Sequence, residues 1–216
     1  MTAMKARGIP IVDVLPQLLA SKKNGFDVYY KTDDHWNTYG AYQGYVAVME
    51  GLNRFYPHLK VRAIEESDFT KRIEPTFHNE FSSYLGLGKW GPMGEFVTLV
   101  PKPGTTLATL IGMPTPEVRD GELPPLVKFD PPLMRELEVE GLASPSGTLQ
   151  HVLMVTSSFG AKMQPFFGTH AKTQWRCRDI YTFPEEILER KVPDLVVEEI
   201  YIRYMVGAPP QNPSLG

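Results

Sequence analysis

Two acidic side chains precede a histidine in the segment KTDDHWN, residues 31–37. A histidine beside a carboxylate can work as a general base, because the carboxylate orients the ring and stabilises its protonated form. If the segment is extended, Asp33 and His35 point to one side and Asp34 points away. We therefore predict that Asp33 orients His35, whereas Asp34 caps the helix that follows or faces solvent.

A second polar segment, TSSFG at residues 156–160, follows the apolar run QHVLMV, which is typical of a buried strand. A serine on a tight turn between a strand and a helix presents its hydroxyl at the edge of the sheet. The free N–H groups of the helix can then stabilise an oxyanion. Such a serine needs a base, which His35 can supply. Ser157 and Ser158 both remain candidates for the nucleophile, and either can instead be a helix cap.

Other readings of the same residues stay open. His35 can be a structural histidine between a strand and a helix. Asp33, Asp34 and His35 can also ligate a metal, but no second cluster of such residues completes a shell, so we predict no metal. The segment GLGKWG, residues 86–91, has the spacing of a dinucleotide-binding loop without the flanking strand and helix. We expect a loop there and no cofactor.

The elements that position these residues alternate between strands and helices. Apolar patterning predicts strands at 8–14, 27–30, 150–155 and 193–202, and helices at 15–23, 38–56, 162–170 and 184–190. This order predicts an α/β domain with a mostly parallel sheet, whose sites form at the carboxyl ends of strands. We expect one domain over residues 1–205, with a proline-rich insertion at 101–147 and a disordered tail at 206–216.

Composition excludes several classes of function. The chain has 216 residues, of which 42% are hydrophobic and 22% charged, as in ordinary soluble globular proteins. The net charge is −3 and no basic face is evident, so we expect no nucleic-acid partner. No run of eighteen apolar residues is present, so we expect no membrane span. The single cysteine, Cys177, excludes an internal disulfide.

Several motifs together resemble those of a known family. Asp33-Asp34-His35-Trp36 with Gly40-Ala41 is similar to the D-x-H-W…G-A signature of the alginate O-acetyltransferase (AlgX/AlgJ-type) family, and Thr156-Ser157-Ser158-Phe159 is similar to its serine motif. The segment 193–204 resembles its closing strand, P-D-x-V-[IV]-x-E…R-Y, and 11–16 resembles a segment ahead of the catalytic pair. These domains are SGNH-hydrolase-like, so the resemblance implies a three-layer α/β sandwich.

The resemblance also implies a function. Ser158, His35 and Asp33 would form a catalytic triad that transfers an acetyl group to a polysaccharide through an acetyl-serine. The acetyl group would come from a membrane-bound O-acyltransferase, outside the cytoplasm. Two alternatives remain open, namely an acetylesterase with the same triad and a degenerate glycan-binding domain. The latter is favoured by Thr156 and Ser157, which replace the family's usual residues before the serine.

Two further expectations follow from the resemblance. Aromatic rings suit the faces of sugars, so Trp36, Tyr39, Trp90 and Phe159 are candidates for lining an acceptor groove, with core packing as the alternative for each. Family members carry early strands and an export signal or membrane anchor ahead of the matching region. Because this sequence starts directly before Gly8, we expect it to be shortened at its N-terminus.

Overall fold

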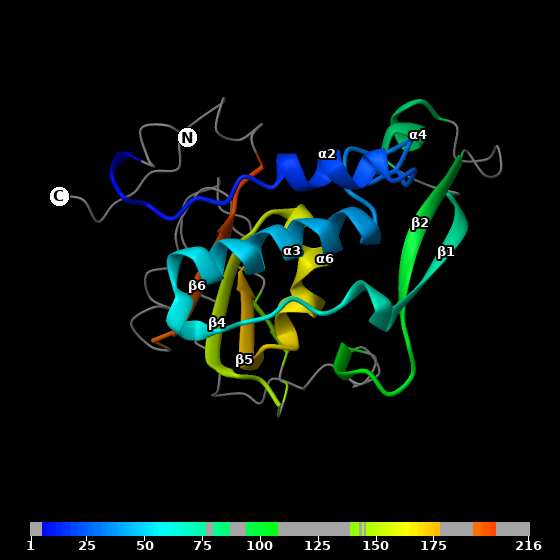
Figure 1. Ribbon diagram of the computed structural model, residues 1–216. Helices are drawn as coiled ribbons and strands as arrows, with labels where there is room; N and C mark the ends of the chain where they lie inside the picture. Colours follow the sequence, from blue (N-terminus) through cyan, green and yellow to red (C-terminus); the bar gives the residue numbers. More distant parts are fainter. Residues whose placement is uncertain are drawn as a thin grey trace. The chain divides into compact units, whose positions relative to one another are not determined.

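The computed structural model describes most of the chain in two compact units, Met1–Thr105 and Thr106–Gly216. The described residues are 6–76, 80–86, 94–107, 139–142, 144, 146–177 and 192–201. Figure 1 shows the elements of both units along the chain. Among the described residues, no helix has both the length and the apolar character needed to cross a membrane.

The first unit is built around two helices, α2 (Leu15–Lys23) and α3 (Thr38–Phe55), which lie side by side (Figure 1). Helix α2 has a proline in its first turn and lysines in its last, as expected from backbone geometry and the helix dipole. Helix α3 buries most of its first two turns, including Tyr39, Ala41 and Tyr45. Both helices lie where the sequence predicts them, with α3 ending just before Pro57.

Two tyrosines of α3 fix the connection that follows it. The hydroxyl of Tyr42 donates a hydrogen bond to the carbonyl oxygen of Ile64 at 2.7 Å, and the N–H of Ile64 donates to the hydroxyl of Tyr45 at 2.9 Å. Burial raises the pKa of both tyrosines, because the phenolate would lose its hydration. The hydroxyls therefore satisfy both backbone groups of a residue that belongs to no sheet.

A two-stranded antiparallel sheet completes the first unit. Strand β1 (Phe69–Thr76) pairs with β2 (Gly94–Pro101), and Ile73 lies opposite Val97. Two short 3-10 helices, η1 (Pro57–Leu59) and η2 (Glu66–Asp68), precede the sheet, and the short helix α4 (Glu80–Tyr84) lies between its strands in the sequence. Only β2 alternates buried and less buried residues clearly, so periodicity did not predict this sheet.

The second unit contains a four-stranded sheet with the order β3-β5-β4-β6. Strand β4 (Leu149–Thr156) pairs in parallel with β5 (Ala171–Cys177) and with β6 (Leu195–Glu199), while β3 (Val139–Leu142) is antiparallel to β5. Helix α6 (Ser158–Gly168) connects β4 to β5 and packs on both strands (Figure 1). The prediction of an α/β fold with a mostly parallel sheet is confirmed.

Burial explains why β4 was predictable and β5 was not. Val152, Leu153 and Met154 are fully buried, as expected for a central parallel strand that is covered on both faces. Strand β5 instead buries two polar residues, Gln174 and Arg176, so its sequence does not read as a core strand. The predicted helix at 162–170 begins earlier, at Ser158.

The predictions of two strands, at 8–14 and 27–30, are wrong. The run 8–14 forms no strand, because Pro10 offers no N–H for a ladder and the carboxylate of Asp13 accepts a hydrogen bond from the N–H of Leu15 at the start of α2. The run 27–30 forms only a single bridge, between Tyr29 and Trp36.

The predicted helix at 184–190 and the tail at 206–216 lie outside the described residues, as does most of the predicted insertion at 101–147, in which β3 and the end of β2 are described. Of the segment GLGKWG, only Gly86 lies within the described residues.

Candidate active site

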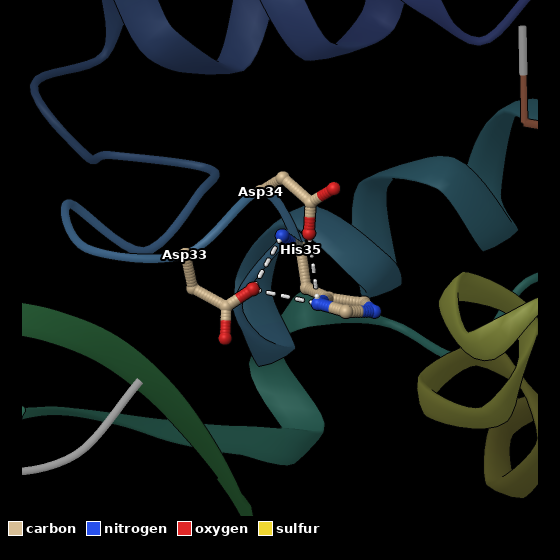
Figure 2. Close-up of side chains that lie close together, drawn as sticks. All are labelled: Asp33, Asp34 and His35. Carbon is tan, nitrogen blue, oxygen red and sulfur yellow. Dashed lines mark hydrogen bonds and ion pairs between the residues drawn. The ribbon is translucent and has the colours of Figure 1, made fainter. Parts of the chain in front are cut away.

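The Asp33–His35 turn of the first unit is closed by its own side chains. Oδ1 of Asp33 accepts a hydrogen bond from the N–H of His35 at 2.9 Å and lies 2.6 Å from Nδ1 of the His35 ring. The first contact is an Asx-turn, in which an aspartate bonds the backbone two residues ahead. The ring is thereby held at Nδ1, with its other nitrogen on the far side from the carboxylates (Figure 2).

The orientation of the Asp34 side chain differs from the predicted one. Its Oδ1 lies 3.2 Å from Nδ1 of His35, and its side chain is only 17% exposed, so it neither faces solvent nor caps the helix. The reason is that residues 31–34 form a turn and not an extended strand, which brings both carboxylates to the same ring nitrogen. The predicted contact between Asp33 and His35 is present, whereas the predicted orientation of Asp34 is wrong.

Asn37 is the true N-cap of α3. Its Oδ1 accepts from the N–H of Gly40 at 2.9 Å, and its Nδ2 donates to the carbonyl oxygen of Asp27 at 2.7 Å. A Cβ atom at Gly40 would overlap the carbonyl oxygen of Val28, so only glycine allows the chain before the turn to lie against the helix. Trp36, the residue after His35, is 4% exposed. The local sequence thus anchors His35 between a bridge and a helix start.

The serine turn of the second unit follows the carboxyl end of β4. Ser157 is the N-cap of α6, and its hydroxyl accepts from the N–H of Phe159 at 3.2 Å. Ser158 is the first residue of the helix and is partly exposed, whereas Ser157 is 2% exposed. A Cβ atom at Gly160 would overlap the side chain of Thr156, so glycine is needed where the helix approaches the strand.

Sequence reasoning gave Glu199 no role, although the residue lies in a quoted motif. Oε2 of Glu199 accepts three hydrogen bonds from the serine turn, namely from the N–H of Ser157 at 2.9 Å, its hydroxyl at 2.6 Å and the N–H of Gly160 at 3.2 Å. The available signal was an acidic residue at the carboxyl end of a parallel strand. The contact with the serine turn can be predicted only if the strand order is known, because β6 lies beside β4 in the sheet.

The proposed aromatic residues are mostly buried. Trp36, Tyr39 and Phe159 are 4%, 2% and 4% exposed, and the ring of Phe159 stacks on that of Tyr201 with centroids 4.5 Å apart. This burial favours core packing over sugar contact for these three. Trp90 lies outside the described residues. Near the His35 turn, Tyr29 is 40% exposed and lines a pocket with Leu15 and Leu19 of α2.

A metal ion would have one possible cluster in the described part of the chain. Asp33, Asp34 and His35 each offer a ligand atom, and these atoms lie within 4.8 Å of one another. The contact of 2.6 Å between Nδ1 and Asp33 is the length of a strong hydrogen bond, and a metal on Nδ1 would displace its proton. The arrangement fits a carboxylate that orients an imidazole better than a metal shell.

The fold is an SGNH-hydrolase-like α/β fold. Residues 1–103 match the model of the family described as "SGNH hydrolase-like domain, acetyltransferase AlgX". This match confirms the family resemblance that the motifs indicate, over the part of the chain that contains the His35 turn. No curated protein sequence matches the chain.

Solved structures share the fold over more of the chain. A DHHW family protein from Eubacterium siraeum is 17% identical, with a TM-score of 0.60 over 91% of this chain and 66% of its own. PatB1 from Bacillus cereus is 15% identical, with a TM-score of 0.55 over 90% and 70%. The O-acetyltransferase domain of Pseudomonas putida AlgJ is 13% identical, with a TM-score of 0.51 over 96% and 65%. The chain thus spans about two thirds of the length of these structures.

Proposed function

We propose that this protein is an O-acetyltransferase that acts on a polysaccharide through Ser158, His35 and Asp33. The observation that carries the proposal is the contact of 2.6 Å between Asp33 and Nδ1 of His35, in a family of acetyltransferase domains. An imidazole held in this way by a carboxylate has its other nitrogen, Nε2, oriented to accept a proton. In this proposal the base takes its proton from Ser158, which is partly exposed at the carboxyl end of a central strand.

The reaction takes place in two halves. In the first, Nε2 of His35 accepts the proton of Ser158 while Oγ attacks the carbonyl carbon of the acetyl donor, and the donor's oxygen leaves with that proton. In the second, His35 deprotonates a sugar hydroxyl, which attacks the acetyl-serine and releases Ser158 with its proton restored. Asp33 keeps Nδ1 protonated and stabilises the imidazolium in both halves.

The hydrogen bonds of the serine turn limit which N–H groups can stabilise the oxyanion. The N–H groups of Ser157 and Gly160 donate to Glu199, and that of Phe159 donates to Ser157. These three N–H groups are already hydrogen-bonded, so the oxyanion must be stabilised by other donors.

The proposal also places the protein outside the cytoplasm, with a membrane-bound O-acyltransferase as the source of the acetyl group. Both points depend on the family resemblance.

A labelling experiment tests the nucleophile. The protein is incubated with a fluorophosphonate and, separately, with an activated acetyl ester, and the modified residue is located by mass spectrometry. We expect the adduct on Ser158, no adduct in Ser158→Ala, and labelling slowed by orders of magnitude in His35→Ala, because triad residues act as a unit. The matched control is Ser157→Ala, which retains Ser158 and should still form the adduct.

An adduct on Ser157, or none on a folded protein, would contradict the triad. A second measurement then separates transfer from hydrolysis, since the same triad performs both. Acetylated polysaccharide formed from an acetyl donor supports the transferase, whereas free acetate alone, at a rate unaffected by added polysaccharide, would replace it by an esterase.

A further inference from the structure

Glu199 is brought to the serine turn by the register of two parallel strands. Thr156, the last residue of β4, is the register partner of Glu199, the last residue of β6. The carboxyl ends of neighbouring parallel strands meet at the same edge of a sheet, so a side chain at the end of β6 can reach the turn that leaves β4. The two residues that make this contact, Ser157 and Glu199, are 42 positions apart in the sequence.

The three hydrogen bonds of Glu199 bracket Ser158 on both sides. One oxygen, Oε2, accepts from the backbone and hydroxyl of Ser157, directly before Ser158, and from the backbone of Gly160, two residues after it. The backbone on either side of Ser158 is therefore tied to one rigid point on the neighbouring strand. Charge-assisted hydrogen bonds of this kind are about twice as strong as neutral ones.

The same contacts determine what Ser157 can do. A hydroxyl has one proton to donate, and that of Ser157 is directed to Glu199 at 2.6 Å while its oxygen accepts from Phe159. A pair formed by Ser157 and Glu199 would itself resemble a nucleophile and a base, but Ser157 is 2% exposed and has no access to a substrate. Ser157 is therefore part of the support of the turn.

We propose that Glu199 is a positioning residue, which holds the turn so that Oγ of Ser158 lies in its reactive geometry. This inference rests on the proposed function, in which Ser158 is the nucleophile. Loss of Glu199 would let the turn shift without removing any reacting group, so the effect should fall on kcat and leave KM nearly unchanged. A misplacement of about 1 Å at a reacting atom can lower a rate about 100-fold.

The experiment compares Glu199→Ala, Glu199→Gln and a neighbouring control, Glu198→Gln, for turnover of an activated acetyl ester and for fluorophosphonate labelling. We expect Glu199→Ala to lower kcat about 10- to 100-fold with KM within about threefold of the wild type. Glu199→Gln keeps a carbonyl oxygen with two lone pairs, which can accept from Ser157 and Gly160, and should restore part of the activity. Glu198 is exposed on the same strand, so Glu198→Gln should behave as the wild type.

Unfolding by urea is followed in parallel, so that a loss of folded protein is separated from a loss of rate. If Glu199→Ala does not fold, Ser157→Ala takes its place, since it removes one of the three contacts and should lower kcat by a smaller factor. A folded Glu199→Ala protein with wild-type kcat, or a Glu199→Gln protein no better than Glu199→Ala, would overturn the inference. A wild-type protein that is neither labelled nor active would instead overturn the proposed function, and this inference with it.

Discussion

The Asp33–His35 turn is held together by neighbours in the sequence, whereas the turn around Ser158 is held by a residue from a distant strand. In the first turn, Asp33 reaches a ring two residues ahead. In the second, Glu199 reaches Ser157 across 42 positions. The proposed base therefore depends on a local motif, whereas the support of the proposed nucleophile depends on tertiary structure. The geometry of the first turn should therefore change mainly with substitutions within the turn itself. The geometry of the second turn should also change with substitutions elsewhere that shift β4 or β6.

The largest expected difference lies within the first turn, between its two aspartates. Asp33→Asn should lower kcat/KM on an activated acetyl ester about 10⁴-fold, because an amide no longer keeps Nδ1 protonated. Asp34→Asn should cost about tenfold or less, since the contact of Asp34 with the ring is longer, 3.2 Å against 2.6 Å. Equal losses in the two variants would show that the carboxylates share the role, against the assignment of Asp33 alone.

The next difference concerns the glycine in each turn. Gly40→Ala should lower the free energy of unfolding by about 3 kcal/mol, because its Cβ would overlap a backbone carbonyl oxygen that cannot rotate away. Gly160→Ala should cost less, about 2 kcal/mol, since the overlapping group is the side chain of Thr156. Urea denaturation measures both. The opposite ranking would mean that the strand-to-helix turn is the more rigid of the two.

The helix caps offer a smaller test. Asn37→Ala removes two hydrogen bonds of a fully buried amide and should destabilise the protein by about 2 kcal/mol. Asn37→Asp keeps the acceptor for Gly40, but its buried carboxylate would face the carbonyl oxygen of Asp27, so at pH 7 it should cost more than Asn37→Ala. Thermal or urea unfolding distinguishes the two variants. A neutral Asn37→Ala substitution would show that α3 starts correctly without its cap.

The smallest effect concerns a histidine of the second unit, His170. Burial lowers the pKa of His170 to about 4, so the unfolded chain binds the proton more readily than the folded one between about pH 4 and pH 6.5. Stability therefore falls as the pH falls through this window. From pH 7 to pH 6 the loss from this group should be about 0.7 kcal/mol. In His170→Gln this part of the pH dependence should be absent, and an unchanged pH profile would contradict the assignment.

Sequence reasoning succeeded where the determining contacts are local. Helix α3 follows from its apolar spacing and from Pro57 behind it, β4 from its unbroken apolar run, and the pairing of Asp33 with His35 from their separation by two residues. It failed for Asp34 because an extended segment was assumed where the chain turns. Strand β5 was not predicted because its sequence contains polar residues. In the structure it is stabilised by pairing with its two neighbours in the sheet.

Glu199 shows why the rest could not be predicted. Two adjacent glutamates end β6, and nothing in their sequence distinguishes the one that contacts the serine turn from the one that is exposed. The alternation of side chains along a strand and the register with β4 make that choice. Both are properties of the assembled sheet.

The origin of Glu199 in the last described strand has a consequence for biosynthesis. When residues 149–168 have been synthesised, Ser158 is already present in the nascent chain. Glu199, whose carboxylate holds the turn, is added 41 residues after Ser158, and its strand β6 must then pair with β4. Contacts between distant parts of a chain form late in folding. An incomplete or nicked chain would therefore carry the serine without its support. Under the proposed function, reactivity at Ser158 would therefore require a polypeptide that is complete through Glu199.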